Sequence, residues 1–166
     1  APLTFKSLVK IFTSFEPNIY TPLSIASHWL EYNLFGFNSA ISHFINLLLH
    51  LICTVLVFQI VTTLVSDMKV AFVIAAIWAV HPVQVESVTW VMERRNLLFG
   101  LFYFASIMAY LKYQQSLRGS DMAAAIIFMV VSSLAKGLAC FLPLVWLMLD
   151  WLKERPLQRP VFSEKL

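Results

Sequence analysis

Apolar positions dominate five stretches of the chain, which are separated by short polar interruptions. The clearest stretch, residues 41–65, contains no formal charge. As a helix rising 1.5 Å per residue, a run of this length can cross the ~30 Å hydrocarbon core of a bilayer. The same pattern predicts four further spans, at residues 69–81, 96–113, 121–135 and 138–152.

The second, fourth and fifth of these spans are short for free-standing membrane helices, which need about 20 apolar residues. Two interpretations are open. Either the polar ends of the spans dip into the membrane and line a water-accessible cavity, or the bilayer thins around them. The first interpretation would make residues 81–95 and 136–137 the floor of a pocket.

Residues 1–40 alternate apolar and charged positions in the way of amphipathic helices that lie in the plane of the membrane interface. Pro17 is expected to end one such helix, and a second is expected to begin near Pro22. The predicted fold class is therefore all-α: a polytopic bundle of about five transmembrane helices over residues 41–152, preceded by interfacial helices at 1–40 and followed by a polar tail at 153–166.

Composition agrees with a membrane protein. Hydrophobic residues make up 60% of the chain and charged residues 13%, with a mean hydropathy of +0.77. Soluble domains have about 45–50% apolar and about 25% charged residues, and a chain of 166 residues is too small to bury such a surplus. Membrane lipids and other membrane helices or subunits are the expected partners. The net charge of +3 is scattered, so nucleic-acid binding is not predicted.

The distribution of basic residues predicts the orientation in the membrane. One side would hold Lys69, Lys112, Arg118 and the basic residues of the tail, and the other side would hold Lys6, Lys10, Arg94, Arg95 and Lys136. The excess of positive charge on the first side favours a cytoplasmic location for it. Residues 1–40 and 81–95 are then extracytoplasmic and the C-terminus is cytoplasmic. Positive charges left on the outer side point to a function.

The candidate chemistry lies in these outer interruptions. A set of polar residues gathers there: His81, Glu86, Glu93, Arg94, Arg95 and Lys136. Guanidinium and ammonium groups at a membrane surface suit a lipid-linked phosphate, and carboxylates suit an acceptor hydroxyl. Alternatively, Arg94 and Arg95 only mark the start of a span and reach lipid headgroups. Lys136 lies between two short apolar runs, where an unpaired ammonium is costly.

Other polar residues inside the apolar runs predict structural contacts. His43, Asn46 and His50 share one helical face, which suits a polar stripe between helices better than a metal site. Asp150 is expected to pair with Lys153 or Arg155. The two cysteines, Cys53 and Cys140, have no metal-ligand spacing and are interpreted as packed free thiols, so neither a metal nor a disulfide is predicted.

Three blocks of residues resemble one known family. They are HPVQVESVTWVMERR at 81–95 with the apolar run after it, Tyr20-Thr21-Pro22-Leu23 with HFINLLLHL at 43–51, and Leu134-Ala135-Lys136-Gly137 with FLPLVWLMLDWL at 141–152. Together they are similar to the polytopic region of bacterial membrane proteins with tetratricopeptide repeats, whose eukaryotic relatives are the transmembrane-and-TPR O-mannosyltransferases.

This resemblance implies a GT-C type fold in a multi-pass protein of the bacterial inner membrane. It also implies a glycosyltransferase that takes a sugar from a polyprenyl-phosphate donor and passes it to a protein acceptor on the extracytoplasmic face. His81, Glu86, Arg94 or Arg95, and Lys136 would then face the donor phosphate and the acceptor.

The resemblance does not assign a catalytic residue in this chain. The family carries its acidic pair in a first external loop, which would precede Ala1. The chain begins without Met and without a signal-peptide pattern, so it is expected to be the interior of a longer protein. The alternative function is a non-catalytic structural or accessory subunit of a larger complex built on the same scaffold.

Overall fold

The computed structural model describes residues 9, 11–13 and 20–152, and within them it is all-helical. This confirms the predicted all-α class for the described part of the chain. The element order is α2 (Pro22–Phe35), α3 (Ser39–Val65), α4 (Met68–Val80), α5 (Pro82–Thr89), the 3-10 turn η1 (Val91–Glu93), α6 (Arg94–Ser116), α7 (Gly119–Ala135), the 3-10 segment η2 (Gly137–Phe141) and α8 (Leu142–Leu152). The predicted helix before Pro17 lies largely outside the described residues, and the tail 153–166 lies wholly outside them.

Local sequence explains where several helices begin. The Asn38 side chain caps α3 by accepting hydrogen bonds from the backbone N–H groups of Ala40 and Ile41, at 3.1 and 3.4 Å. Asp67 caps α4 in the same way. Such caps satisfy backbone donors that have no partner inside the helix. Pro22 is the first residue of α2, a position that lacks an intrahelical N–H bond in any case.

The polar interruption at 81–95 is helical rather than a loop. Its first half forms α5, which is bent by 56° from α4, and its second half forms η1 and the start of α6. His81 has extended backbone angles at the bend, because a residue before proline is disfavoured in the α region. The predicted span at 138–152 is also divided, since the chain runs as the 3-10 segment η2 before α8 begins at Leu142.

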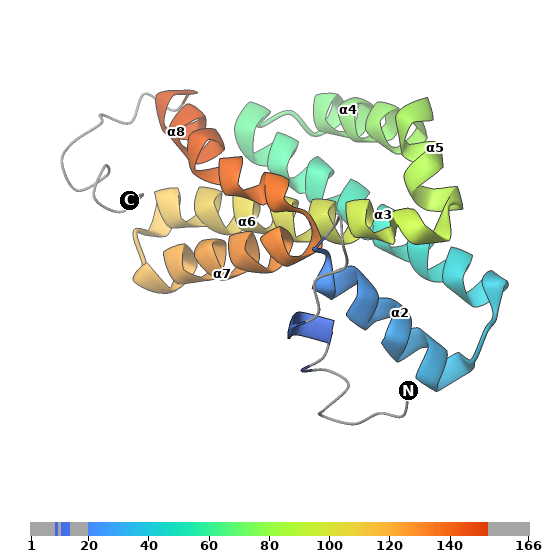
Figure 1. The fold of residues 1–166 in the computed structure, drawn as a ribbon. Helices are drawn as coiled ribbons and strands as arrows, with labels where there is room; N and C mark the ends of the chain where they lie inside the picture. The colour runs from blue at the N-terminus through green and yellow to red at the C-terminus, as the bar shows by residue number, and fades with distance from the viewer. Residues whose placement is uncertain (1–8, 10, 14–19, 153–166) are drawn as a thin grey trace.

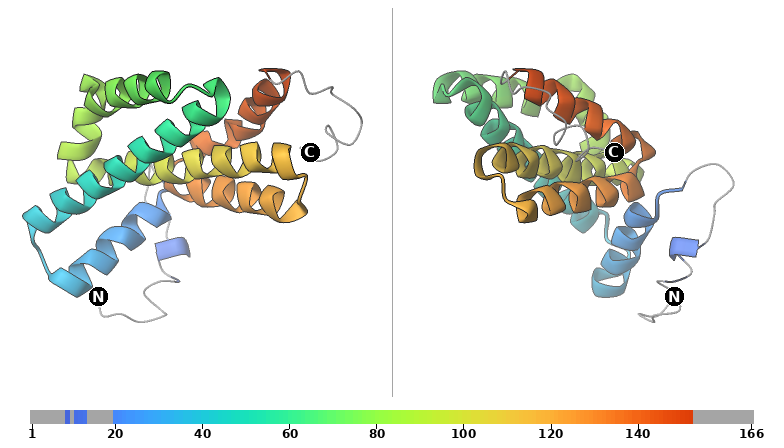
Figure 2. Two further views of the ribbon diagram at one scale, coloured as in Figure 1. Left: turned by 180° about the vertical axis from the view of Figure 1, so that it is seen from behind. Right: turned by 90° about the vertical axis from the view of Figure 1, so that its left-hand side faces the viewer.

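The helices pack as an antiparallel pair with α3 lying across it (Figure 1). α6 and α7 run side by side, α3 contacts α6 and α4, and α2 extends away from the end of the pair where α6 begins. Figure 2 shows the same arrangement from behind and from the side, with α8 running obliquely to α6. Serine hydroxyls join the pair: Ser106 donates to the carbonyl of Ala125 and Ser132 to that of Phe99. Small polar residues of this kind allow close helix contacts.

The buried core lies between α6, α7 and α8. Tyr110, Leu142 and Trp146 are among its most deeply buried members, and the rings of Tyr110 and Trp146 stack with centroids 5.0 Å apart. Large apolar side chains on α3 and α4, among them Phe44 and Phe72, are instead exposed. The exposed apolar faces of α3 and α4 are suited to contact with lipid.

Among the described helices, α3 is long and apolar enough to cross a membrane, and the bent pair of α4 and α5 would make a second crossing. α7 and the stretch Gly137–Leu152 are apolar but shorter. The bundle of about five spans stays a prediction.

Candidate functional site

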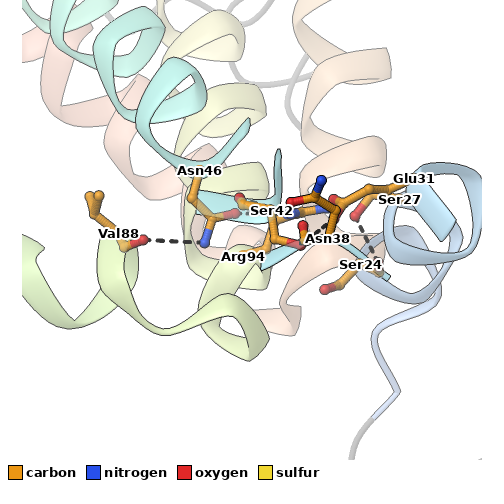
Figure 3. Close-up of polar contacts among 8 residues, drawn as sticks. All are labelled: Ser24, Ser27, Glu31, Asn38, Ser42, Asn46, Val88 and Arg94. Carbon is orange, nitrogen blue, oxygen red and sulfur yellow. Dashed lines mark hydrogen bonds and ion pairs between the residues drawn. The ribbon is translucent and has the colours of Figure 1, made fainter. Parts of the chain in front are cut away.

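Arg94, the first residue of α6, is buried at the junction of three helices (Figure 3). Its side chain is 1% exposed, and its Nη1 atom lies 2.5 Å from the Glu31 carboxylate of α2. Its Nε donates to Oδ1 of Asn46 at 2.8 Å, and its Nη2 donates to the backbone carbonyl of Ser42 at 3.2 Å. One guanidinium therefore joins α2, α3 and α6.

The acceptors around Arg94 are themselves held by further hydrogen bonds. The Ser42 hydroxyl donates to the second oxygen of the Glu31 carboxylate. Asn46 Nδ2 donates to the backbone carbonyl of Val88 in α5, at 3.3 Å. A buried ion pair is tolerated when its remaining polar atoms are also satisfied. We call Glu31, Ser42, Asn46 and Arg94 the Arg94 cluster.

The lipid-headgroup interpretation is wrong for Arg94. Neighbouring residues of a helix point about 100° apart, so only one of the two adjacent arginines can face the bundle. Arg94 faces it, whereas Arg95 is 31% exposed. Arg94 is held by Glu31, Asn46 and Ser42, and its contact with a donor phosphate stays a prediction.

Arg95 and Lys136 meet through a second group of polar side chains. Lys136 Nζ donates to Oδ1 of Asn96 at 3.0 Å, and Asn96 Nδ2 donates to Glu93 Oε2 at 2.7 Å. Arg95 forms an ion pair with the same Glu93 carboxylate. The antiparallel packing of α6 and α7 causes this meeting, because the end of α7 lies beside the start of α6. We call Glu93, Arg95, Asn96 and Lys136 the Lys136 cluster.

The other two predicted site residues lie apart from these clusters. The His81 side chain is exposed, and its Nδ1 accepts a hydrogen bond from the backbone N–H of Val83. Glu86 is exposed on α5. Within the described residues, no hydrogen bond or ion pair joins either side chain to Arg95 or Lys136.

A cavity of about 550 Å³ lies beside the Arg94 cluster. Its walls come from α2, the connection from α2 to α3, the start of α3, and η1. The residues around it are His28, Glu31, Tyr32, Gly36, Phe37, Asn38, Ser39, Ser42, Val91 and Met92. None of the five predicted site residues lines it. We call it the α2 cavity.

Sequence reasoning missed the roles of Glu31 and Asn96. Glu31 was expected only to lie in the interface, yet its side chain is 7% exposed and pairs with Arg94. For Asn96 the sequence predicts only the start of a span. One signal could have pointed to them: a buried arginine and a half-buried lysine each require an acceptor, and these residues supply one.

The polar stripe on α3 is confirmed for two of its three residues. Asn46 and His50 are buried and contact neighbouring segments, His50 Nε2 lying 2.9 Å from the backbone carbonyl oxygen of Ala79. His43 is exposed. The described residues contain no group of three or more His, Cys, Asp or Glu side chains that could hold a metal ion.

Asp150 is fully buried, and its carboxylate accepts hydrogen bonds from Tyr110 and Gln114. Its expected partners Lys153 and Arg155 lie outside the described residues. The Cys53 thiol is buried, as predicted for a packed cysteine, whereas the Cys140 thiol is exposed.

Two groups at the α2 cavity have lowered pKa values. Burial lowers the pKa of His28 below 6.5, and the positive charge of Arg94 lowers it further against the opposing charge of Glu31. Burial alone would raise the pKa of Glu31, but hydrogen bonds from Ser42 and Arg94 and the charge of Arg94 leave it below 4.5. A neutral imidazole and an ionised carboxylate therefore face the same cavity near neutral pH.

These shifts predict that acid destabilises the fold in two steps. For each group the folded pKa is the lower one, so the unfolded chain takes up a proton more readily. His28 contributes to the free energy of unfolding above pH 6.5, and this contribution is lost as the pH falls from there through the folded pKa of His28. The stabilising contribution of Glu31 is lost in the same way as the pH falls below 4.5. Thermal unfolding midpoints of the full-length protein in detergent, measured from about pH 7.5 to about pH 4, test this.

The His28→Gln variant should lack the first step, while His43→Gln, which alters an exposed histidine, should keep it. A wild-type midpoint that falls no more than that of His28→Gln between about pH 7 and about pH 5 would contradict the assignment.

Comparison with known proteins shows which enzymes this chain resembles in sequence. The chain is 36% identical over 99 residues to protein O-mannosyl-transferase TMTC1 of Mus musculus, covering 59% of this chain and 10% of the relative. It is 28% identical over 120 residues to protein O-mannosyl-transferase TMTC3 of Homo sapiens, covering 70% of this chain and 13% of the relative. The homologues of this chain are protein O-mannosyl-transferases.

A relative from Drosophila melanogaster, protein O-mannosyl-transferase Tmtc2, is 29% identical over 103 residues, which are 61% of this chain and 11% of the relative. The chain thus spans about a tenth of the length of the curated relatives it matches. No family model matches it, and no solved structure matches it significantly. The resemblance to O-mannosyltransferases is confirmed, while the GT-C fold and the bacterial membrane stay predictions.

Proposed function

We propose that this chain is part of a membrane glycosyltransferase that takes a sugar from a polyprenyl-phosphate donor and transfers it to a protein hydroxyl on the extracytoplasmic face. The observation that carries the proposal is the similarity to protein O-mannosyl-transferases, which extends over 99 residues at 36% identity in one relative. The Lys136 cluster adds two cations of the kind that a donor phosphate requires.

The Lys136 cluster has hydrogen-bond donors to spare for a phosphate. An ammonium carries three N–H donors and a guanidinium carries five. The described contacts use one donor of Lys136, toward Asn96, and the Nε and Nη2 donors of Arg95, toward Glu93. With one carboxylate and two cations, the cluster has a net positive charge. At a membrane surface, where the dielectric constant is low, that charge attracts an anionic headgroup strongly.

The cluster would act on the leaving group. In the transfer, the bond from the sugar C1 to the phosphate oxygen breaks and a bond from C1 to the acceptor oxygen forms, while the acceptor hydroxyl gives up its proton to a general base. Negative charge develops on the departing phosphate, and Lys136 and Arg95 would stabilise it. Arg94 would position Arg95 by fixing the start of α6, and His81 and Glu86 are proposed to line the outer approach. The catalytic base is not assigned to a residue of this chain.

Replacing Lys136 by Ala in the full-length protein should lower kcat/KM for sugar transfer about ten- to hundredfold, since a charged hydrogen bond to phosphate is worth about 1.5–3 kcal/mol. The assay would use radiolabelled mannose on polyprenyl phosphate as donor and membrane proteins as acceptors. Lys136→Arg keeps the charge and should retain more activity than Lys136→Ala.

A matched control is Lys112→Ala, which removes an exposed lysine near the other end of α6, about 25 Å from Arg95 at 1.5 Å per residue. It should leave transfer unchanged. Equal transfer by Lys136→Ala and the wild type, at equal expression, would contradict the role of the cluster.

The second candidate function is a non-catalytic subunit of a larger membrane complex. The exposed apolar faces of α3 and α4 favour it, because such faces can bind neighbouring helices as well as lipid. The same assay separates the two candidates. A full-length protein that transfers no sugar but co-purifies in fixed stoichiometry with other membrane proteins would support the second.

A further inference from the structure

His28, one of the residues that line the α2 cavity, has a polar atom that the protein leaves unsatisfied. Nε2 of His28 is buried and has no hydrogen-bond partner among the residues that the structure describes. A buried polar group without a partner costs about 1–3 kcal/mol, so such groups call for an explanation. If the imidazole ring turns toward the cavity that His28 lines, a ligand bound there can supply the partner.

The charges around the cavity indicate which ligand it suits. The Glu31 carboxylate lies in its wall and is held ionised by Ser42 and Arg94. An ionised carboxylate repels a phosphate, and Arg94, which could attract one, is already paired. The His28 imidazole is neutral and can accept a hydrogen bond from a hydroxyl. The cavity therefore suits an uncharged hydroxyl group rather than the donor phosphate.

The walls also provide an apolar surface for the rest of such a ligand. The rings of Tyr32 and Phe37 lie 4.5 Å apart between centroids, and both residues line the cavity together with Met92. Phe37 is 97% exposed and Met92 is 66% exposed, so these side chains are accessible from outside. Exposed aromatic and methionine side chains are frequent in surfaces that bind peptides.

The cavity lies next to the Lys136 cluster along the chain. Met92 lines the cavity, and the following residue, Glu93, belongs to the Lys136 cluster. The Arg94 side chain pairs with Glu31 in the cavity wall, and the Arg95 side chain pairs with Glu93. Consecutive Cα atoms are about 3.8 Å apart. A hydroxyl bound in the cavity and a phosphate bound at the cluster would thus both contact residues of one short segment, residues 92–95.

We propose that the α2 cavity binds the acceptor of sugar transfer, a serine- or threonine-bearing protein segment, with its hydroxyl at His28 Nε2. This inference rests on the proposed function. It makes His28 a residue that binds the acceptor, and it makes Tyr32, Phe37 and Met92 the apolar contacts of the flanking peptide.

A kinetic experiment on the full-length protein tests the role of His28. In the variant His28→Ala, the KM for an acceptor peptide pool with one central Thr should rise about five- to tenfold, as loss of one hydrogen bond implies, while the KM for mannosyl polyprenyl phosphate stays unchanged. His28→Gln, which keeps a polar group, should recover part of the loss, and His43→Ala, an exposed histidine on α3, should show none. A rise in the donor KM alone, or unchanged values for both, would overturn the inference.

A binding experiment separates this inference from the proposed function, because it needs no turnover. A photo-crosslinking amino acid in place of Met92 should capture the Thr-containing peptide pool, and a matched pool with Ala in place of Thr should be captured less. The same amino acid in place of Met68, an exposed residue at the start of α4, should capture neither. Capture without any sugar transfer would overturn the proposed function and keep the cavity as a hydroxyl-binding site. Equal capture of both pools would overturn the acceptor assignment.

Discussion

Arg94→Ala is expected to destabilise the protein by about 3–5 kcal/mol, because it leaves the Glu31 carboxylate buried without its cation. The same change removes the hydrogen bonds from the guanidinium to Asn46 and to the Ser42 carbonyl. Since these contacts join α2, α3 and α6, the loss should loosen α2 first. The unfolding midpoint of the full-length protein in detergent, followed by tryptophan fluorescence, measures the effect.

Two further variants make this prediction specific. Arg95→Ala removes the neighbouring, partly exposed arginine, and it should cost less than Arg94→Ala, because the Glu93 carboxylate keeps the hydrogen bond from Asn96. In the double variant Arg94→Met with Glu31→Leu, both charges are replaced by apolar groups, and most of the stability should return. If Arg94→Ala unfolds at the same midpoint as Arg95→Ala, the buried ion pair does not hold α2 in place.

Trp146→Ala should destabilise the protein by a similar amount, about 3–5 kcal/mol, through the cavity that it opens in the core. Trp146 is 2% exposed on α8 and stacks on Tyr110 of α6. Tyr110 also donates a hydrogen bond to the Asp150 carboxylate on α8. The side chain of Tyr110 therefore contacts α8 at two residues, Trp146 through its ring and Asp150 through its hydroxyl. Loss of the indole ring should therefore weaken the attachment of α8 to α6.

The same helix offers a matched control for this change. Trp151 is 77% exposed on α8, and Trp151→Ala should change the unfolding free energy by no more than about 0.5 kcal/mol. Denaturant unfolding in mild detergent, compared for the two variants at equal protein concentration, separates the two positions. A smaller loss for Trp146→Ala than for Trp151→Ala would contradict the described core.

The helices follow closely from the sequence. The apolar run at 41–65 becomes α3 at Ser39–Val65, and the run at 121–135 becomes α7 at Gly119–Ala135. These elements depend on local features, namely apolar side chains in a continuous run and capping residues such as Asn38. The sequence does not predict that the span at 138–152 is divided at Gly137–Phe141, because a 3-10 segment has no hydrophobic pattern of its own.

The candidate site follows from the sequence only in part. Arg94, Arg95 and Lys136 were grouped by charge and by their expected side of the membrane. The structure joins Arg95 and Lys136 through Glu93 and Asn96, whereas it buries Arg94 against Glu31. The α2 cavity could not be found in the sequence, because its walls come from separate segments between His28 and Met92.

The sequence by itself determined that the chain is helical and apolar, where most helices begin, and which protein family it resembles. All of these depend on residue types and on spacings of a few positions. Only the tertiary structure decided which charges pair, because Arg94 and Glu31 lie 63 residues apart and Lys136 and Asn96 lie 40 apart. Such partners are fixed by how each helix is rotated and packed. Burial then makes pairing obligatory, since a charge removed from water needs a partner nearby.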